Sequence, residues 1–138
     1  MALPKDLKIH TNPDGSFTSV HASVKIGTDV YIHWRTLIDD DVVIGNSTVI
    51  EEKCVIERDA VIGSYVKIMF GAKIEKDVKI ANRTVIGSMA VVEDDTIIGT
   101  NVEIGEGSVI GRESVLSNGS KVKKYRRISP RSDIGPEE

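Results

Sequence analysis

Residues 49–68 read VIEEKCVIERDAVIGSYVKI, and within them an aliphatic side chain returns at every sixth position, from Ile50 to Ile68. The same step of six runs from Val20 to Ile128 without an insertion or a deletion. Its nineteen positions are Val20, Ile26, Ile32, Ile38, Ile44, Ile50, Ile56, Ile62, Ile68, Ile74, Ile80, Ile86, Val92, Ile98, Ile104, Ile110, Leu116, Val122 and Ile128. A fixed short period is typical of a parallel β-helix, in which each hexad supplies one strand and one turn. The sequence therefore predicts an all-β protein, a β-helix of about six triangular coils with about 18 residues in each.

The residues around each aliphatic position repeat as well, and they predict which side chains point inward. Two residues earlier the chain carries a small or β-branched residue, as at Val24, Thr36, Cys54, Ala60, Ala90, Ser108 and Ser114. Because successive side chains of a strand point to opposite faces, we expect these residues to share the interior with the aliphatic series. The turn residue before the small position is often acidic or an amide, as at Asp29, Asp41, Asp59, Asp77, Asp95 and Asn101. Asp and Asn tolerate positive φ, so we interpret them as turn formers rather than ligands.

Two segments lie outside the repeat. Residues 1–17 contain Asn12-Pro13-Asp14-Gly15 between two short runs, which predicts a β-hairpin. We expect this hairpin to cap the first coil, because the end of a β-helix exposes core and unpaired strand edge. The β-helix itself would occupy residues 18–128. Residues 129–138 are predicted to be a flexible tail, because Arg126 stands at a small inward position and the segment is rich in turn-forming residues.

Composition excludes several classes of protein. A length of 138 residues predicts one domain, and a net charge of −3 favours neither a nucleic acid nor an anionic membrane as partner. No run approaches the roughly 20 apolar residues of a membrane span, and no signal-peptide pattern opens the chain, so we expect a cytoplasmic protein. The lone Cys54 falls on an inward position, which predicts a buried, inert thiol rather than a disulfide or a nucleophile.

Stacking the sequence on a period of 18 gathers the turns into three corners of different character. The acidic corner comprises residues 39–41, 57–59, 75–77, 93–95 and 111–113. It carries eleven acidic and three basic residues. Carboxylates could bind a hard cation there, but a solvated acidic ridge explains them without a ligand and is the interpretation we favour. The neutral corner comprises residues 27–29, 45–47, 63–65, 81–83 and 99–101.

The aromatic corner comprises residues 33–35, 51–53, 69–71, 87–89, 105–107 and 123–125. Its predicted substrate or partner surface consists of Trp34, Arg35, Phe70 and Met89. A solvated ridge does not require such side chains. His33 lies one coil from Glu51, so we expect a hydrogen-bonded pair in which the carboxylate orients the imidazole as a general base. The alternative for this corner is a subunit contact beside a surface histidine.

The residues between the inward positions form aliphatic rows on the outside. One row is Leu37, Val55, Val91 and Val109, and the next is Val43, Val61, Ile97 and Val115. Exposed aliphatic rows of this length predict a partner. The coil that carries Lys67, Lys73 and Lys79 interrupts them.

The pattern as a whole resembles the hexapeptide-repeat transferase superfamily. Residues 20–27, VHASVKIG, together with residues 30–34, VYIHW, are similar to the opening coils of nucleotide-sugar N-acetyltransferases. The resemblance implies a left-handed β-helix and a parallel homotrimer with grooves between neighbouring prisms. It also implies a CoA-dependent acyltransferase that acts on a sugar or amine acceptor.

On this resemblance His33 would be the catalytic base, with Glu51 orienting it, and acetyl-CoA or another acyl-CoA would be the cofactor. The predicted cofactor-binding residues are Lys121, Lys123, Lys124, Arg126 and Arg127. Lys and Arg at this end of the repeat could hold the CoA phosphates. A solvated basic tail is the alternative for this cluster.

Several departures from the superfamily keep a second hypothesis open. The unbroken register leaves no excursion loop for a catalytic His, and the Gly-Asn-Pro-Ala turn and the C-terminal helix of other members have no counterpart. A zinc site like that of the related carbonic anhydrases is rejected, because all three His precede residue 34 and His21 and His33 fall at different corners. The alternative function is a non-catalytic β-helix, a scaffold or assembly protein that oligomerises through its outer faces.

Overall fold

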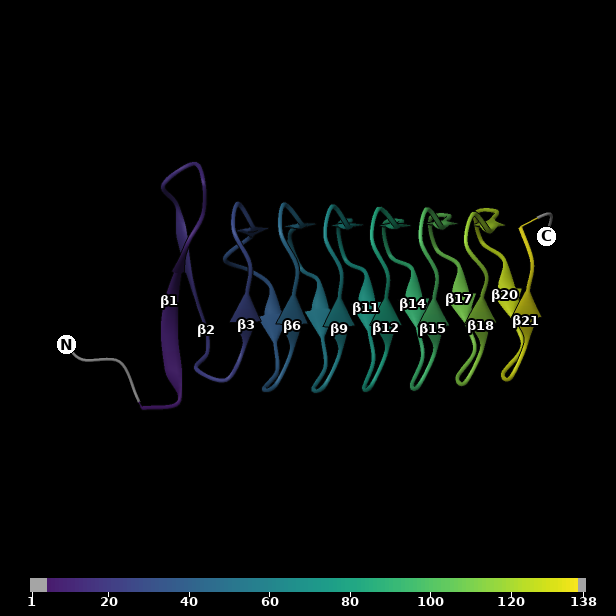
Figure 1. Ribbon diagram of the computed structural model, residues 1–138, viewed down its shortest axis with the longest axis horizontal. Helices are drawn as coiled ribbons and strands as arrows, with labels where there is room; N and C mark the ends of the chain where they lie inside the picture. Colours follow the sequence, from purple (N-terminus) through teal and green to yellow (C-terminus); the bar gives the residue numbers. More distant parts are fainter. Residues whose placement is uncertain (1–4, 137–138) are drawn as a thin grey trace.

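The computed structural model describes residues 5–136 and confirms the predicted all-β architecture. A hairpin of five-residue strands, β1 (Leu7–Thr11) and β2 (Phe17–His21), precedes a series of two-residue strands. That series is β3 (Lys25–Ile26), β4 (Tyr31–Ile32), β5 (Leu37–Ile38), β6 (Val43–Ile44), β7 (Val49–Ile50), β8 (Val55–Ile56), β9 (Val61–Ile62), β10 (Lys67–Ile68), β11 (Lys73–Ile74), β12 (Lys79–Ile80), β13 (Val85–Ile86), β14 (Val91–Val92), β15 (Ile97–Ile98), β16 (Glu103–Ile104), β17 (Val109–Ile110), β18 (Val115–Leu116), β19 (Lys121–Val122), β20 (Arg127–Ile128) and β21 (Asp133–Ile134). Figure 1 shows these strands stacked along the long axis, with the hairpin at one end.

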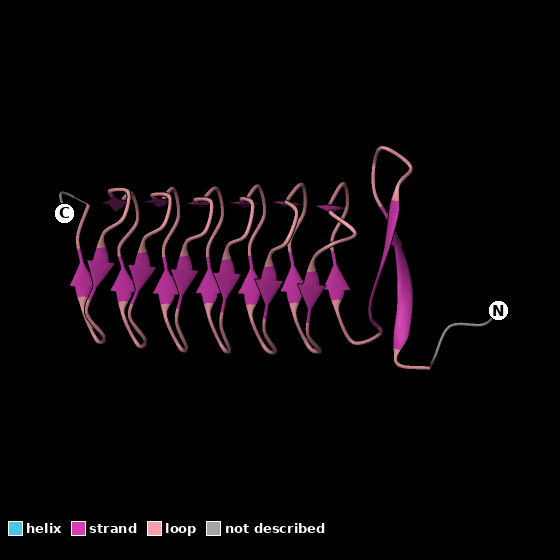
Figure 2. Ribbon diagram, turned by 180° about the vertical axis from the view of Figure 1, so that it is seen from behind, coloured by secondary structure: helices cyan, strands magenta, loops and turns pink. Residues whose placement is uncertain are grey.

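Three parallel sheets form the sides of a triangular prism. Sheet 1 contains β3, β6, β9, β12, β15, β18 and β21; sheet 2 contains β4, β7, β10, β13, β16 and β19; sheet 3 contains β5, β8, β11, β14, β17 and β20. Each strand pairs with the strands one coil before and after it, as Lys79 does with Val61 and Ile97. These partners are 18 residues apart, so the predicted coil length is confirmed. The view from the opposite side shows the same unbroken succession of strands and turns (Figure 2). The architecture is consistent with the left-handed β-helix that the resemblance implied.

The interior is filled by the predicted aliphatic series. All nineteen positions are buried except Ile26 and Ile38, which are partly buried and pack against the core in the first coil. The small inward positions are buried too, and their hydroxyl groups find partners in the backbone of the next coil. Thr48 Oγ1 donates to the carbonyl of Gly63 at 2.7 Å, and Thr84 Oγ1 donates to that of Gly99 at 2.8 Å. Within residues 5–136 no buried side-chain nitrogen or oxygen lacks a hydrogen-bond partner, so these polar groups enter the core at little cost.

Turns close in the left-handed region, as the sequence predicted. The six Asp and Asn residues interpreted as turn formers have φ between 55° and 62° (Asp29, Asp41, Asp59, Asp77, Asp95 and Asn101). Larger residues adopt the same angle at matching positions, for example Tyr65 at 59° and Met89 at 61°. Such an angle is costly for a bulky side chain, so the stacked coils impose it.

The hairpin caps one end of the prism with side chains from alternate residues. The first residue of a strand donates its N–H to the coil that follows, as Lys25 N–H does to the carbonyl of Val42 at 2.9 Å. In the first coil, the carbonyl groups of Val24, Val30 and Ile32 and the N–H of Ile32 face the hairpin. Lys8 Nζ donates to Val24 O, and His10 Nε2 donates to Val30 O at 2.8 Å. Asn12 is only 4% exposed. Its side chain makes the two hydrogen bonds that the backbone of a neighbouring strand would otherwise make.

Asn12 achieves this with the two ends of its side-chain amide. Its Nδ2 donates to the carbonyl of Ile32 at 2.9 Å, and its Oδ1 accepts from the N–H of the same residue at 2.7 Å. The amide thus satisfies the open edge of β4. The turn that positions it is held by Asp14, whose carboxylate accepts from the backbone N–H and the hydroxyl of Ser16; these bonds lower the pKa of that carboxyl.

The other end of the repeat differs from the expected boundary after residue 128. Strand β21 pairs with β18, with Ile134 opposite Leu116, and Ile134 is buried. Ile134 continues the step of six from Ile128. Arg126 does not end the helix, because it remains partly exposed while its backbone N–H donates to Ser108 Oγ at 3.2 Å. The predicted flexible tail was therefore wrong for the segment that forms β21, and its last two residues lie outside the described part of the chain.

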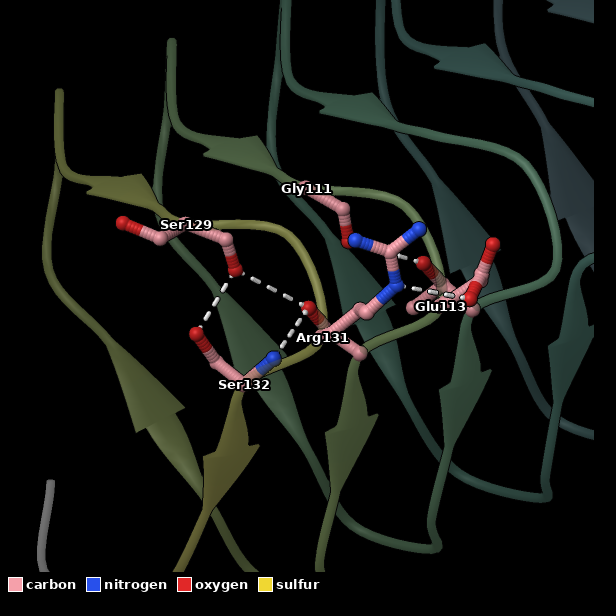
Figure 3. Close-up of polar contacts among 7 residues, drawn as sticks. Gly111, Glu113, Ser129, Arg131 and Ser132 are labelled. Carbon is pink, nitrogen blue, oxygen red and sulfur yellow. Dashed lines mark hydrogen bonds and ion pairs between the residues drawn. The ribbon is translucent and has the colours of Figure 1, made fainter.

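Figure 3 shows the turn that carries the chain into this last strand. Ser132 Oγ donates to the carbonyl of Ser129 at 2.6 Å, and Ser114 Oγ donates to the same carbonyl at 3.2 Å. Arg131 Nε lies 3.1 Å from Glu113 Oε2 in the coil before it.

Within residues 5–136, no helix has the length and apolar character needed to cross a membrane.

Candidate functional site

The aromatic corner follows sheet 2, and the sheet register places its turns directly above one another. Tyr31 pairs with Val49 and Val49 with Lys67, so the turns that follow these strands stack at one edge. The structure thus brings the predicted site residues of the first, second and third coils to the same edge of the prism. Whether these residues could act together depends on which hydrogen bonds and ion pairs their side chains already form.

His33 is held by its own turn. The backbone N–H of Arg35 donates to His33 Nδ1 at 3.1 Å, and the imidazole stacks on Trp34 with ring centroids 5.8 Å apart. A backbone N–H can only donate, so Nδ1 is the unprotonated nitrogen and a neutral His33 carries its proton on Nε2. A general base needs a lone pair on the nitrogen that meets the substrate. In this arrangement the only lone pair of the ring is already in use.

Glu51 is also committed to other groups. Its Oε1 accepts from the backbone N–H of Phe70 at 3.1 Å, and its Oε2 lies 3.7 Å from Lys67 Nζ. The predicted hydrogen bond to His33 is not formed: within the part of the chain that the structure describes, no hydrogen bond or ion pair joins the two side chains. The reason is local: His33 Nδ1 accepts from a backbone N–H of its own turn, and Glu51 accepts from the N–H of Phe70 in the coil that follows, on the side away from His33.

The predicted partner surface gathers along this corner. The Arg35 guanidinium lies 4.8 Å from the Trp34 ring centroid and forms an ion pair with Glu52 at 3.2 Å. Phe70 lies two coils further on, with Lys53 Nζ 5.7 Å from its ring centroid. Trp34 is 62% exposed and Met89, one coil beyond Phe70, is 56% exposed. Cations over aromatic rings account for part of this exposure without a ligand.

Met89 shows why glycine alternates with large residues at this edge. Gly71 has a φ of 71°, and a side chain on it would collide with the sulfur of Met89. The bare backbone of one coil therefore receives the side chain of the next.

The structure separates the predicted CoA-binding cluster. Lys121 projects from sheet 2 and lies 3.7 Å from Glu103, Lys123 and Lys124 stand exposed at the aromatic corner, and Arg127 projects from sheet 3. Arg126 occupies a partly buried inward position. Five coils separate Lys123 from His33, which is about 24 Å along the prism at the usual strand spacing. Lys123 and Lys124 therefore lie at the opposite end of the aromatic corner from the predicted base.

The remaining histidines and the cysteine have structural partners. His21 Nδ1 lies 2.8 Å from Ser23 Oγ, and His10 caps the first coil as described above. Cys54 is fully buried, and this burial raises the pKa of its thiol to about 11. Its sulfur donates to the carbonyl of Met69 at 3.0 Å. The prediction that this thiol is buried is confirmed, and the raised pKa suits an unreactive group.

Carboxyl groups of the acidic corner lie close enough to shift one another's pKa values, but they do not form a set of metal ligands. Burial and the neighbouring Asp94 raise the pKa of Glu75, although Lys73 lies 3.7 Å away. A hydrogen bond between Asp39 and Asp40 lowers the pKa of the first and raises that of the second. Across residues 5–136, the structure contains no group of three or more His, Cys, Asp or Glu side chains that could hold a metal ion.

The outer faces differ in how much aliphatic surface they expose. On sheet 1, Val43 is 37% exposed, Val61 38%, Ile97 48% and Val115 40%. On sheet 3, Leu37 is 69% exposed, whereas Val55, Val91 and Val109 are only partly exposed. A shallow groove of about 320 Å³ lies on this face. It is lined by Leu37, Ile38, Asp39, Val55, Ile56 and Glu57. Sheet 1 therefore offers the more continuous exposed aliphatic row.

Sequence reasoning missed the residues that cap the first coil. Lys8, His10 and Asn12 all carry hydrogen-bond donors, and they alternate along the first strand of the hairpin and the turn that follows it. Alternation in a strand places side chains on one face, so this spacing was a usable signal. It was obscured because the apolar residues of the strand, Leu7 and Ile9, lie on its other face and suggest that this other face is the covered one, whereas Ile9 is 51% exposed.

Stacked hexads, a period of 18 and parallel sheets define this protein as a hexapeptide-repeat β-helix. More particularly, the family model described as the GMPPB C-terminal domain matches residues 38–129, and the chain belongs to that family. A search of curated proteins returns no match.

Solved structures of the same fold include several acyltransferases. A candidate acetyltransferase from Bacillus cereus superposes with a TM-score of 0.74 at 19% identity, covering 80% of this chain and 68% of that one. The acetyltransferase domain of PglB from Neisseria gonorrhoeae, in complex with acetyl coenzyme A, gives 0.67 at 19% identity, covering 84% and 50%. A hexapeptide transferase family protein from Anaplasma phagocytophilum gives 0.51 at 18% identity, covering 88% and 71%. At these identities the likeness establishes the fold, and the chain spans half of the Neisseria domain.

Proposed function

We propose that this chain is a β-helical assembly module, which self-associates through the outer faces of its prism and is not itself a catalyst. The single observation that carries the proposal is the exposed aliphatic row of sheet 1, where Val43, Val61, Ile97 and Val115 are 37–48% exposed. Removing such a row from water is favourable by about 25 cal/mol for each Å² of apolar surface. A second copy of a regular, rigid prism can cover it without any rearrangement.

The hydrogen bonds of the two predicted catalytic residues support the same proposal. The lone pair of His33 and the carboxylate of Glu51 stabilise turns of the β-helix, as Arg35 N–H and Phe70 N–H show. Neither group is left poised to move a proton. The family description supports it as well, since it names a C-terminal domain, that is, a module within longer proteins.

Sedimentation velocity tests the proposal. The wild-type chain should sediment as a particle heavier than one 15.1-kDa chain at micromolar concentration. Replacing Val61 and Ile97 together by Lys should shift it to the monomer while the circular dichroism spectrum stays unchanged. The matched control, Ser88→Lys with Thr100→Lys, adds the same charges at turns and should leave the assembly intact. A wild-type chain that stays monomeric across the concentration range would overturn the proposal.

A second candidate is CoA-dependent acyl transfer to a sugar or amine. It is supported by the acetyltransferase structures of the same fold and by the exposed Lys123 and Lys124 at the aromatic corner. In this case Lys123, Lys124 and Arg127 would hold the cofactor phosphates, and the cofactor would supply the activated acyl group. Trp34, Phe70 and Met89 would line the acceptor side. The predicted parallel homotrimer would provide the groove.

Calorimetric titration with acetyl-CoA distinguishes the two candidates. Acyl transfer requires saturable binding that is lost in Lys123→Ala with Lys124→Ala, and turnover of an amine acceptor that is lost in His33→Ala. The assembly module requires neither, and its self-association should be unchanged in both variants.

A further inference from the structure

The outward residues of sheet 1 form a nearly symmetric pattern along the prism. Cross-strand pairing sets them in the order Lys25, Val43, Val61, Lys79, Ile97, Val115 and Asp133. The sheet has seven strands, so Lys79 on β12 stands at its centre. Two aliphatic residues follow on each side of it, and the two ends carry opposite charges. The row is about 29 Å long at the usual strand spacing.

We propose that sheet 1 packs against sheet 1 of a second copy around a twofold axis that crosses the prism at Lys79, so that the two β-helices run antiparallel. This inference rests on the proposed self-association and names its face and its direction. The interface is isologous, because the same patch serves both copies. It differs from the parallel homotrimer that the superfamily resemblance implied.

Charge matching favours the antiparallel direction. Turning the row end for end places Lys25 opposite the partner's Asp133, and it does so twice. In a parallel pair about a twofold axis along the prism, each level would meet itself, so Lys25 would face Lys25 and Asp133 would face Asp133. Like charges placed directly opposite are unfavourable, and complementary charges fix the register of an interface.

The aliphatic residues match in the same register. Val43 falls opposite the partner's Val115, and Val61 falls opposite the partner's Ile97. All four are exposed in the single chain, so their contact removes apolar surface from water on both copies. Lys79 then falls at the axis and faces the partner's Lys79, as it also would in the parallel pair, so this central level does not distinguish the two directions.

The same axis brings the acidic corner of one copy next to the acidic corner of the other, along one edge of the dimer. Their repulsion opposes assembly, but exposed charges are screened within about 8–10 Å at physiological salt. Lys79 of each copy lies beside its own acidic corner, two residues from Asp77. A cation at the centre of the row therefore offsets the carboxylates that the axis brings together, which gives the interruption of the row a role.

Cysteine crosslinking tests the direction. The native Cys54 is fully buried, so a short bis-maleimide linker should not join wild-type chains. Val43→Cys should crosslink only when mixed with Val115→Cys, because each substituted residue lies about four coils, or about 19 Å, from its own copy in the partner. Lys79→Cys should crosslink with itself and serves as the positive control for contact through sheet 1.

The outcomes separate this inference from the proposed function. Crosslinking of Val43→Cys with itself would show a parallel pair and overturn the antiparallel direction. No crosslink in any variant, with an oligomer in sedimentation, would overturn the choice of sheet 1 but leave self-association standing. A monomer in sedimentation would overturn both.

A charge exchange tests the end pairs. Asp133→Lys should weaken the dimer about tenfold, since two exposed pairs turn from attraction to repulsion. Adding Lys25→Asp to the same chain should restore the wild-type dissociation constant, because opposite charges again meet at both ends. A double variant no tighter than Asp133→Lys alone would overturn the pairing of Lys25 with Asp133.

Discussion

The two ends of the β-helix are closed by different means. At the N-terminal end a buried amide, Asn12, bonds both the N–H and the carbonyl of Ile32 and so replaces a strand. At the other end the last described coil is held by its backbone bonds to the coil before it and by the buried bond from Ser120 Oγ to Ile134 O, and its remaining side-chain contacts, such as the ion pair between Arg131 and Glu113, are largely exposed. Buried hydrogen bonds are costly to remove because they leave unpaired groups away from water, whereas exposed ones are replaced by water.

The contrast teaches that a uniform repeat need not be uniformly stable. Every interior coil makes the same hydrogen bonds to its neighbours, so differences in stability arise where a coil has only one neighbour. We therefore expect the hairpin to set the stability of the first coils and the last coil to open first. Three substitutions examine this expectation.

The largest effect is expected at the hairpin. Asn12→Ala should lower the free energy of unfolding by about 2–3 kcal/mol, because it leaves the N–H and the carbonyl of Ile32 unpaired in a buried site. Urea denaturation followed by circular dichroism measures the loss.

The matched control is Asn118→Ala, in the turn one coil beyond residues 99–101 of the neutral corner. Asn118 Oδ1 accepts from the exposed N–H of Thr100 at 2.8 Å, so water can take its place. This substitution should cost about 0.5–1 kcal/mol. Equal losses in the two variants would mean that the hairpin amide is no more important than a turn amide, and the proposed difference between the ends would fail.

Most of the fold could be predicted because its rule is carried by side-chain chemistry at a fixed step. The aliphatic series placed the core, and the Asp and Asn residues placed the left-handed turns. The boundary after residue 128 failed for a physical reason. A long side chain such as Arg126 can leave an inward position for solvent while its backbone continues the ladder, so one unsuitable residue does not end a coil.

The candidate site was less predictable, because it depends on hydrogen bonds rather than on stacking. The period correctly set His33 one coil from Glu51, but it could not show that Arg35 N–H and Phe70 N–H lie nearer to these side chains. Backbone groups at tight turns compete for every adjacent acceptor. Stacking in register therefore indicates which residues are neighbours, and not which of them are bonded.

An intermediate effect is expected at the last strand. Ile134→Ala should cost about 1–2 kcal/mol, less than the 2–5 kcal/mol typical of an enclosed isoleucine, because only one coil packs against it. Hydrogen exchange should show faster exchange at the backbone N–H of Val115 and Ser117, which donate to β21 and its flanks, and no change at the first coil. Faster exchange along the whole prism would show that the coils unfold as one unit and would contradict independent ends.

The smallest effect is expected at the ion pair of the same coil. Glu113→Gln removes the charge that faces Arg131 at 3.1 Å, but both side chains are about half exposed, at 46% and 63%. The cost should stay below about 0.5 kcal/mol and should vanish in high salt, because an exposed pair is largely screened. Urea denaturation at low and high salt measures it, with Arg112→Gln as a control that removes a charge from the same turn. A loss above 1 kcal/mol that survives high salt would mean that this ion pair, and not the stacking of Ile134, closes the end of the β-helix.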